Sequence, residues 1–473
     1  MAGTFLSIFA PIARVIPEVG KPDRDVTFRE KAVYTVICLL LYLVMAQIPL
    51  FGLPKNIGPD PFFWMRTILA SSRGTLMELG IGPIVTAGLI MQLLSGSQLI
   101  DVDFSDPEDR SLFTAAQKVL SVVMTVFQAL AYLIGGAFGT LRPEITALIF
   151  VQLIFAGLVL MLMDELLQKG WGLGSGISLF IAAGVAEQVA WNSLGLVISP
   201  EDGKYYGALI AFGQYIAEGD ALTAFNRPGR LPDMTGFIAT AVVFVIVVYM
   251  QSIRIEVPLT YAKYRGFKGR YPIKFFYSSN IPVILAAAFF ANIYLVGQLV
   301  WSRYNKSNSN FWYNIIGTFE STDQGLNPTG GLVYYLTPPR GIEIVMADPL
   351  RAVTYLIVLI VACAIFSVTW IEVGGMAPRD VSKQLLDAGM MIPGFRSSPK
   401  ILEKLLKRYI GPVSLWGGVA IGIIAAFADY LGALGTGMGI LLATMIIQQY
   451  YEIIAKERLA DLHPALRGFL GFG

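Results

Sequence analysis

The chain contains one histidine among 473 residues, and charged residues make up only 14% of it, against about 25% in an ordinary soluble domain. His463 lies near the C-terminus, so the apolar segments hold no histidine for catalysis, metal ligation or an intramembrane Ser–His protease. Cys38 and Cys363 each lie within an apolar run and indicate neither a disulfide framework nor a metal site. No Gly-x-x-x-x-Gly-Lys-Ser/Thr phosphate-binding loop occurs. We therefore expect that the chain is not an enzyme and binds no cofactor or metal.

Long apolar runs are what the sequence has instead. Apolar residue types make up 55% of the chain and aromatic residues 12%, with 48 glycines and a mean hydropathy of +0.62. A helix needs about 20 apolar residues to cross the hydrocarbon core of a bilayer. Ten stretches reach or approach that length, which predicts an all-α polytopic membrane protein with ten transmembrane helices. They run Ala32 to Pro54, Leu79 to Ile100, Val119 to Leu141, Ile145 to Met163, Gly170 to Ala186, Met234 to Ile253, Phe275 to Ser302, Ala352 to Ile371, Tyr409 to Ala428 and Tyr430 to Tyr451.

The distribution of lysine and arginine predicts the orientation. An even number of spans puts both termini on one side, and a cytoplasmic placement gives that side 24 of the 35 basic residues. We expect a multi-pass protein of the cell membrane, or of the endoplasmic reticulum in a eukaryote, with both termini cytoplasmic. The expected segments are an N-terminal amphipathic segment at 1–31, a five-helix half at 32–198, an external loop at 199–233, a second five-helix half at 234–455 with cytoplasmic loops 254–274 and 372–408, and a cytoplasmic tail at 456–473. A disordered tail is the alternative for the first of these segments.

An internal repeat relates the two halves. Pro83-Ile-Val-Thr-Ala87 in the second span is matched by Pro282-Val-Ile-Leu-Ala286 in the seventh, and Leu173-Gly-Ser-Gly-Ile177 in the fifth by Leu434-Gly-Thr-Gly-Met438 in the tenth. Because each half has an odd number of spans, corresponding helices run in opposite directions, and we predict inverted, pseudo-symmetric halves with the functional centre between them. Inverted repeats with interrupted helices are also typical of secondary transporters of small solutes. A membrane scaffold without conduction is a third possibility.

Branched aliphatic residues recur in the repeated spans at helical spacing. Residues three or four apart share one helix face, so these pairs could converge, with Leu442, into a narrow apolar collar that excludes water and ions. The alternative is that they face lipid. The pairs are Ile81 and Val85, Ile177 and Ile181, and Ile281 and Ile284.

Polar residues inside the spans are few. Thr86, Gln92, Gln128 and Asn292 could hydrogen-bond across an interface that opens reversibly, or could serve as ordinary polar contacts between packed helices. No Asp, Glu, Lys or Arg occupies the middle of a predicted span. A proton-coupled pump would therefore lack its usual relay.

A basic, aromatic loop follows the sixth span. It includes Lys263 and Arg265, and no acidic residue occurs between Glu256 and Glu320. Such a loop could contact nucleic-acid phosphates, or it could only fix the orientation of the neighbouring spans.

These motifs resemble the SecY family, the large subunit of the Sec protein-conducting channel, in its archaeal and eukaryotic branch. The resemblance covers nearly the whole chain. It is most specific in four blocks, which begin Leu79-Gly-Ile-Gly-Pro83, Gly174-Ser-Gly-Ile177, Tyr271-Pro-Ile-Lys274 and Leu434-Gly-Thr-Gly437.

The resemblance implies a clamshell of ten helices around an hourglass pore. A ring of six aliphatic side chains would seal the pore, a segment at about 55–76 would plug it from outside, and helices 2 and 3 would face helices 7 and 8 at a lateral gate. The implied ring residues are Ile81, Val85, Ile177, Ile181, Ile284 and Leu442; the plug residues are Phe62, Phe63, Trp64 and Arg66; the gate residues are Thr86, Gln92, Gln128 and Asn292.

The resemblance also implies a function and partners. The chain would be the central pore-forming subunit of a protein translocation channel, passing unfolded secretory polypeptides across the membrane and releasing hydrophobic segments sideways into lipid. Lys263 and Arg265 match the ribosome-contacting tip of the first basic loop, and Arg379 matches that of the second. The implied partners are the ribosome, the nascent polypeptide with its signal sequence, membrane lipid, and small single-span subunits of the SecE and SecG/beta type in a heterotrimer.

Overall fold

The computed structural model describes residues 9–53, 66, 69–96, 99–100, 102, 106–135, 138, 141–261, 268–322, 325–387, 389–391 and 399–462. In this part of the chain a helix occupies each of the ten expected spans, so the predicted helical membrane fold is confirmed. Eight of these helices are long and apolar enough to cross a membrane. The ten are α3 (Phe28–Gln47), α5 (Gly82–Gly96), α6 (Pro107–Ile134), α7 (Pro143–Leu166), α8 (Gly176–Leu194), α10 (Met234–Ser252), α11 (Ile281–Tyr304), α15 (Pro349–Val373), α17 (Pro399–Tyr430) and α18 (Gly437–Leu462).

Side-chain caps explain where several of these helices begin. The Thr27 side chain accepts a hydrogen bond from the backbone of Glu30, whose own side chain bonds back to Thr27, which forms a capping box at the start of α3. Asp106, Asp233 and Asp348 accept backbone N–H bonds at the starts of α6, α10 and α15. Each cap satisfies donors that the first turn of a helix leaves unpaired.

The two halves of the chain meet along three main pairs of helices. In the described part of the chain α5 packs against α11 and α15, and α8 packs against α18. Buried apolar side chains from both halves form one contiguous cluster, the central apolar cluster, which includes Tyr42, Phe180, Phe290, Tyr355 and Leu442. The molecule's main core therefore lies between the halves.

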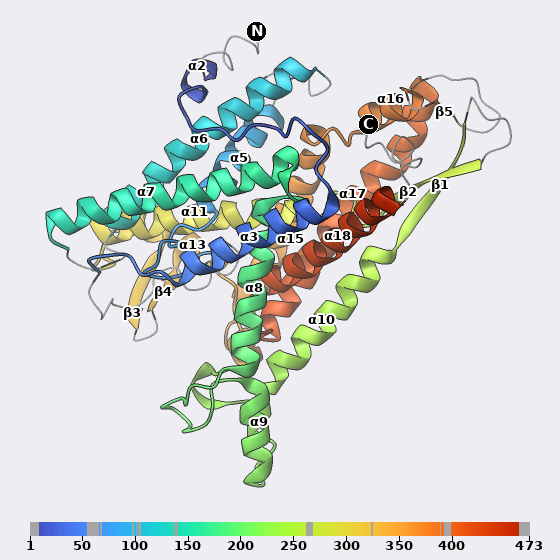
Figure 1. Ribbon diagram of the computed structural model, residues 1–473. Helices are drawn as coiled ribbons and strands as arrows, with labels where there is room; N and C mark the ends of the chain where they lie inside the picture. Colours follow the sequence, from blue (N-terminus) through green and yellow to red (C-terminus); the bar gives the residue numbers. More distant parts are fainter. Residues whose placement is uncertain are drawn as a thin grey trace.

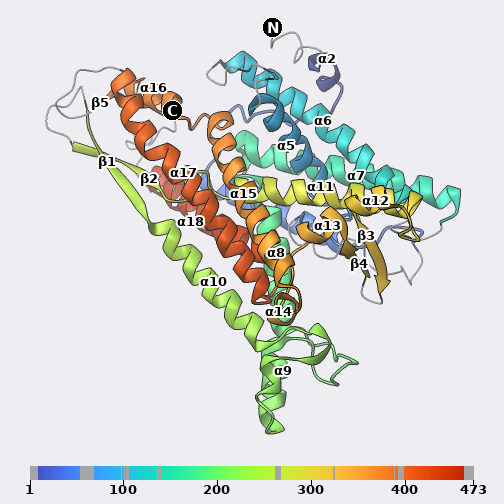
Figure 2. The ribbon, with the colours of Figure 1, turned by 180° about the vertical axis from the view of Figure 1, so that it is seen from behind.

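A small sheet joins the two basic loops. The strands β1 (Arg254–Tyr261) and β2 (Lys268–Lys274) form an antiparallel hairpin, and β5 (Met390–Met391) pairs with the far end of β1. The helix α16 (Pro378–Asp387) packs beside it, and Val257, Ile273, Leu385 and Leu406 belong to a separate apolar core at this end. Figures 1 and 2 show the hairpin projecting from the helical body next to α16, on what we call the sheet side.

The N-terminal segment is fastened to the helical body. Its helix α2 is only Ala10–Ala13 and packs against α6, and Phe9 packs against an apolar cluster that contains Met91. Glu18 pairs with Lys169 in η1 (Leu167–Trp171), a π-helical turn that continues α7. Residues 1–8 of the predicted amphipathic segment lie outside the described residues.

The opposite side carries the remaining elements. The segment between α11 and α15 folds into short helices and a two-stranded hairpin, and the segment between α8 and α10 projects from the body (Figures 1 and 2). These elements are α9 (Ala208–Ala217), η2 (Thr223–Phe225), η3 (Pro228–Arg230), α12 (Phe311–Ile316), β3 (Thr318–Thr322), β4 (Gly325–Gly330), α13 (Gly331–Leu336) and α14 (Ile342–Ala347).

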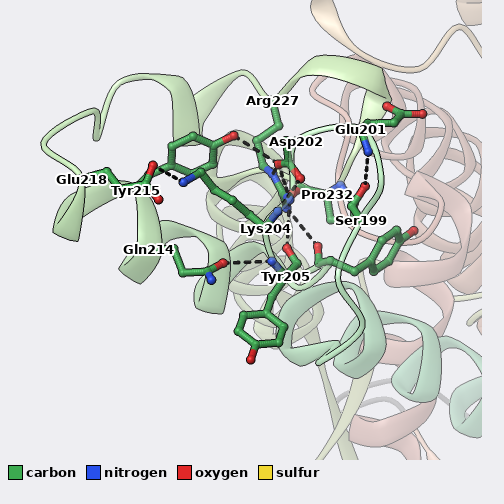
Figure 3. A network of polar contacts seen from close by, with 11 residues as sticks. Ser199, Glu201, Asp202, Lys204, Tyr205, Gln214, Tyr215, Glu218, Arg227 and Pro232 are labelled. Carbon is green, nitrogen blue, oxygen red and sulfur yellow. Dashed lines mark hydrogen bonds and ion pairs between the residues drawn. The ribbon is translucent and has the colours of Figure 1, made fainter.

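The projecting segment is organised around one buried arginine (Figure 3). Nη2 and Nε of Arg227 donate to Oδ2 of Asp202 at 2.7 and 3.1 Å, and its remaining donors reach the carbonyl oxygens of Tyr205, Tyr206 and Pro232. The Tyr215 hydroxyl donates to the same carboxylate at 3.1 Å. This predicted external loop is thus a folded unit with its own polar core.

Candidate functional site

The six predicted ring residues lie in one apolar environment. Ile81, Val85, Ile181, Ile284 and Leu442 are buried in the central apolar cluster, and Ile177 packs against it partly exposed. They come from the start of α5 and from α8, α11 and α18, so both halves of the repeat contribute. An apolar constriction assembled from two halves can exclude water and ions.

Prolines and glycines place these residues at the beginnings of helices. Pro83 and Pro282 occupy the first turns of α5 and α11, where a missing N–H costs nothing, rather than kinking the spans in the middle. Gly174 and Gly435 have φ values of 68° and 101°, just before α8 and α18 begin. Only glycine adopts such a conformation without strain. In each Gly-x-Gly pair the first glycine therefore turns the chain, and the second is the first residue of the next helix.

Three of the four predicted gate residues meet at Thr86. Its Oγ1 accepts from Nδ2 of Asn292 at 3.0 Å and from Nε2 of Gln128 at 3.2 Å. The contact joins α5 and α6 to α11, across the boundary between the halves. Gln92 lies on α5 outside this group, and its Oε1 is buried without a hydrogen-bond partner in the described part of the chain.

The predicted plug segment begins and ends at a closed neck. Backbone bonds pair Leu50 N with Gly74 O at 2.8 Å and Leu76 N with Ile48 O at 3.0 Å, which ties the end of α3 to the approach to α5. The two ends of the segment are therefore held together just before the ring residue Ile81.

The described end of the plug segment touches the ring directly. The backbone N–H of Ile81 donates to the carbonyl oxygen of Leu69 at 2.8 Å, and the Tyr42 hydroxyl donates to Ala70 O at 3.2 Å. Arg66 makes a buried ion pair with Glu78 at 2.7 Å. Phe62, Phe63 and Trp64 lie outside the described residues.

Of the three predicted ribosome-contacting residues, one lies in the part of the chain that the structure describes and two do not. Lys263 and Arg265 lie outside the described residues, between β1 and β2. Arg379 is exposed in the first turn of α16. Because β5 pairs with β1, the chain brings the two basic loops together on one surface, which the sequence pattern did not indicate.

Buried carboxylates are the residues that the sequence reading missed. Glu78, Asp164 and Asp429 are all buried, although the sequence places each at or beyond the end of an apolar stretch, where a charge is unremarkable. A carboxylate beside a glycine-rich turn was the available signal, because such turns expose backbone N–H groups that need an acceptor.

Comparison with known proteins identifies the family. The sequence profile of SecY matches residues 75–451, and that of the plug domain of Sec61p matches residues 40–74. The chain belongs to the SecY family. The plug profile ends within the closed neck described above, directly before the SecY match begins.

Solved structures of SecY relatives resemble the chain over nearly its full length. One, described as "The structure of a protein conducting channel", is 40% identical, covers 97% of this chain and 99% of its own, and has a TM-score of 0.84. Sec61 in a canine ribosome-channel complex from the endoplasmic reticulum is 39% identical with a TM-score of 0.81, again covering 97% and 99% of the two chains. A yeast Ssh1 complex bound to the 80S ribosome is 29% identical, with 94% of each chain covered and a TM-score of 0.79.

These matches confirm the predicted resemblance and the predicted class of function. SecY relatives are protein-conducting channels, and the profile and the structures agree over both halves of the chain. The alternative of a small-solute transporter is not favoured.

Proposed function

We propose that the chain is the central pore-forming subunit of a protein translocation channel and that its ring residues form the seal. Unfolded secretory polypeptides would cross between the halves, while the aliphatic side chains close around them. The observation that supports this is the meeting of Ile81, Ile181, Ile284 and Leu442 in one buried cluster between the halves. The channel carries out no covalent chemistry of its own.

Resting ion conductance tests the seal. Ile81, Val85, Ile177 and Ile181 are changed together to serine in the reconstituted channel complex, because polar side chains allow water to wet a constriction. We expect a higher resting conductance than in the unchanged channel. The matched control changes the exposed Val242 and Val245 of α10 to serine, and it should leave conductance unchanged. A quadruple variant as tight as the control would overturn the ring assignment.

We propose that the Thr86 group lies at the lateral gate, through which a sufficiently apolar segment moves from the pore into lipid. The hydrogen bonds from Gln128 and Asn292 would hold the gate closed. Partitioning then depends on the segment's own transfer free energy.

We propose that the sheet side is cytoplasmic and binds the ribosome, with Lys263, Arg265 and Arg379 as contacts to RNA phosphates. The single-span partners of the SecE and SecG/beta type would cover lipid-facing helices. Orientation is testable because Cys38 and Cys363 are buried. An impermeant maleimide should label cysteine placed at the exposed Lys21 only from the cytoplasm, and cysteine placed at Ser307 only from outside. Labelling from the reverse sides would overturn this orientation.

A further inference from the structure

Two buried carboxylates stand at equivalent positions in the inverted repeat. Asp164 lies near the end of α7, and Asp429 lies at the end of α17, each on the helix that directly precedes a Gly-x-Gly motif. Their exposed fractions are 7% and 2%. An aspartate is rarely buried to this extent unless its oxygens are satisfied.

The two oxygens of each carboxylate have corresponding hydrogen-bond partners in the two halves. Oδ1 of Asp164 accepts the backbone N–H of Ile177 at 3.0 Å, and its Oδ2 accepts from the Gln168 amide at 2.7 Å. Oδ1 of Asp429 accepts the backbone N–H of Gly437 at 2.7 Å, and its Oδ2 accepts from the Tyr355 hydroxyl at 3.2 Å. In both halves, one oxygen therefore caps the following helix and the other is anchored by a side chain.

The second glycine of each motif allows this contact. A Cβ at Gly176 would lie 2.7 Å from Cα of Asp164, and a Cβ at Gly437 would lie 2.8 Å from the backbone nitrogen of Asp429. Neither position tolerates a larger residue without displacement of the helix start. The first turn of α8 thus packs closely against α7, and the first turn of α18 packs closely against α17.

These caps lie close to the ring along the chain. Ile181 and Leu442 each follow, by five residues, the glycine that starts their helix. At 1.5 Å per residue this is about 7.5 Å of helix. Ile177, a further ring residue, donates the capping hydrogen bond itself. Movement of a helix start would therefore carry ring side chains with it.

We propose that Asp164 and Asp429 are paired positioning residues that hold α8 and α18 in register and so set the closure of the ring. The proposal rests on the sealing role proposed above for the ring. It adds a pair of residues that touch neither the pore nor the polypeptide and act through the backbone of the two helices. Because the repeat is inverted, the two caps hold the ring from opposite sides of the membrane.

Leucine and asparagine substitutions separate the cap from mere packing. Asp164→Leu and Asp429→Leu remove the acceptor, and we expect each to raise resting ion conductance of the reconstituted complex several-fold. Asp164→Asn retains an oxygen for Ile177, and its amide can pair with a reoriented Gln168 side chain, so it should restore conductance close to that of the unchanged channel. Asp429 also attracts the nearby Arg340, which makes Asp164→Asn the cleaner conservative variant.

Asp233→Ala is the matched control. Asp233 caps α10 with a 2.7 Å bond from Gly236, and α10 supplies no predicted ring residue. This variant should lower thermal stability without raising resting conductance. A leak from Asp233→Ala equal to that of the leucine variants would mean that any lost cap opens the channel, and it would overturn the specific role of the pair.

Two further variants decide the question if the leucine variants do not accumulate. Gly176→Ala and Gly437→Ala keep both carboxylates but force the helix starts to shift, and we expect them to leak. If they fold and stay sealed while Ile181→Ser leaks, the positioning role is refuted and the ring stands. If Ile181→Ser and Leu442→Ser also stay sealed, the ring assignment fails as well.

Discussion

Nη2 of Arg66 donates to Oε1 of Glu78 at 2.7 Å, and the two side chains are only 10% and 1% exposed. Glu78 also accepts from the backbone N–H of Gly74 in the neck of the plug segment. One buried carboxylate therefore ties the plug segment to the residues that lead into the ring.

Breaking this ion pair should loosen the plug. Glu78→Gln removes the negative charge from a buried ion pair, and loss of one member of a buried pair typically costs about 3–5 kcal/mol. We expect more frequent openings in single-channel recordings. The charge exchange Arg66→Glu with Glu78→Arg should recover part of the closed state.

An exposed pair provides the comparison. Arg24 and Glu30 also lie 2.7 Å apart, but their side chains are 71% and 34% exposed. Glu30→Gln should leave openings unchanged, since exposed pairs contribute little. Equal effects of the two glutamine variants would mean that the Arg66–Glu78 ion pair has no specific role in keeping the channel closed.

The gate contact predicts a change in the threshold for membrane insertion. Thr86→Val keeps the shape of the side chain but leaves the Gln128 amide without this acceptor in the closed state. The Asn292 amide loses one of its two acceptors and keeps the carbonyl oxygen of Ala288. Each unsatisfied buried group costs about 1–3 kcal/mol, so less hydrophobic segments should open the gate. Insertion of a graded series of Leu/Ala test segments measures this shift.

Gln92→Leu is the control on the same helix. Because Gln92 does not join the Thr86 group, its substitution should move the threshold less than Thr86→Val does. A larger effect at position 92 would place the polar element of the gate elsewhere on α5.

Much of the helical arrangement was predictable, because hydrophobicity over about 20 residues is a strong signal. The sixth span was expected at 234–253 and is α10, Met234–Ser252. The fifth and tenth spans begin later than expected, at Gly176 and Gly437, because positive-φ glycines before them interrupt the helix. Hydrophobicity alone does not report this conformation.

Other features depended on contacts that sequence patterns do not encode. The β1 strand had a visible signal, since the aliphatic residues Ile255, Val257 and Leu259 occupy every second position, yet only the fold reveals that β5 joins it. Thr86, Gln128 and Asn292 were predicted as gate residues, but their convergence on one hydroxyl depends on how α5, α6 and α11 pack. Glu78 has no local feature that identifies Arg66 as its partner.

The basic tips predict salt-dependent ribosome binding. Lys263→Glu with Arg265→Glu should weaken binding most at low salt and reduce the slope of log affinity against log salt, because phosphate contacts release counterions. Cosedimentation with ribosomes over a salt series measures this slope. Arg254→Glu, at the base of the hairpin rather than its tip, is the control. Binding that is insensitive to salt in the unchanged channel would contradict the proposed contacts.

Asp202 and Arg227 predict that the projecting segment loosens in acid. Burial alone would raise the pKa of Asp202, but the hydrogen bonds from Arg227, the Lys204 backbone and Tyr215, together with the Arg227 charge, outweigh it, so the pKa lies below its ordinary value. A carboxyl group whose folded pKa is lowered contributes stability above its unfolded pKa, about 3.9, and loses that contribution as pH falls through the folded value. The segment should therefore be stable at neutral pH and lose order below about pH 4.

A dye on a cysteine placed at the exposed Ala217 reports this change through its anisotropy, since both native cysteines are buried. Asp202→Asn leaves the buried Arg227 charge without its partner, so the segment should already be loosened at neutral pH and should respond less to acid. If the variant kept the acid response of the unchanged chain, another carboxyl group would have to carry it. Asp348→Asn is the control, because Asp348 lies in a different segment and the hydrogen bond from the Tyr334 hydroxyl likewise lowers its pKa. This variant should leave the acid response of the dye at position 217 unchanged. That result would show that the response is local to the Asp202–Arg227 pair.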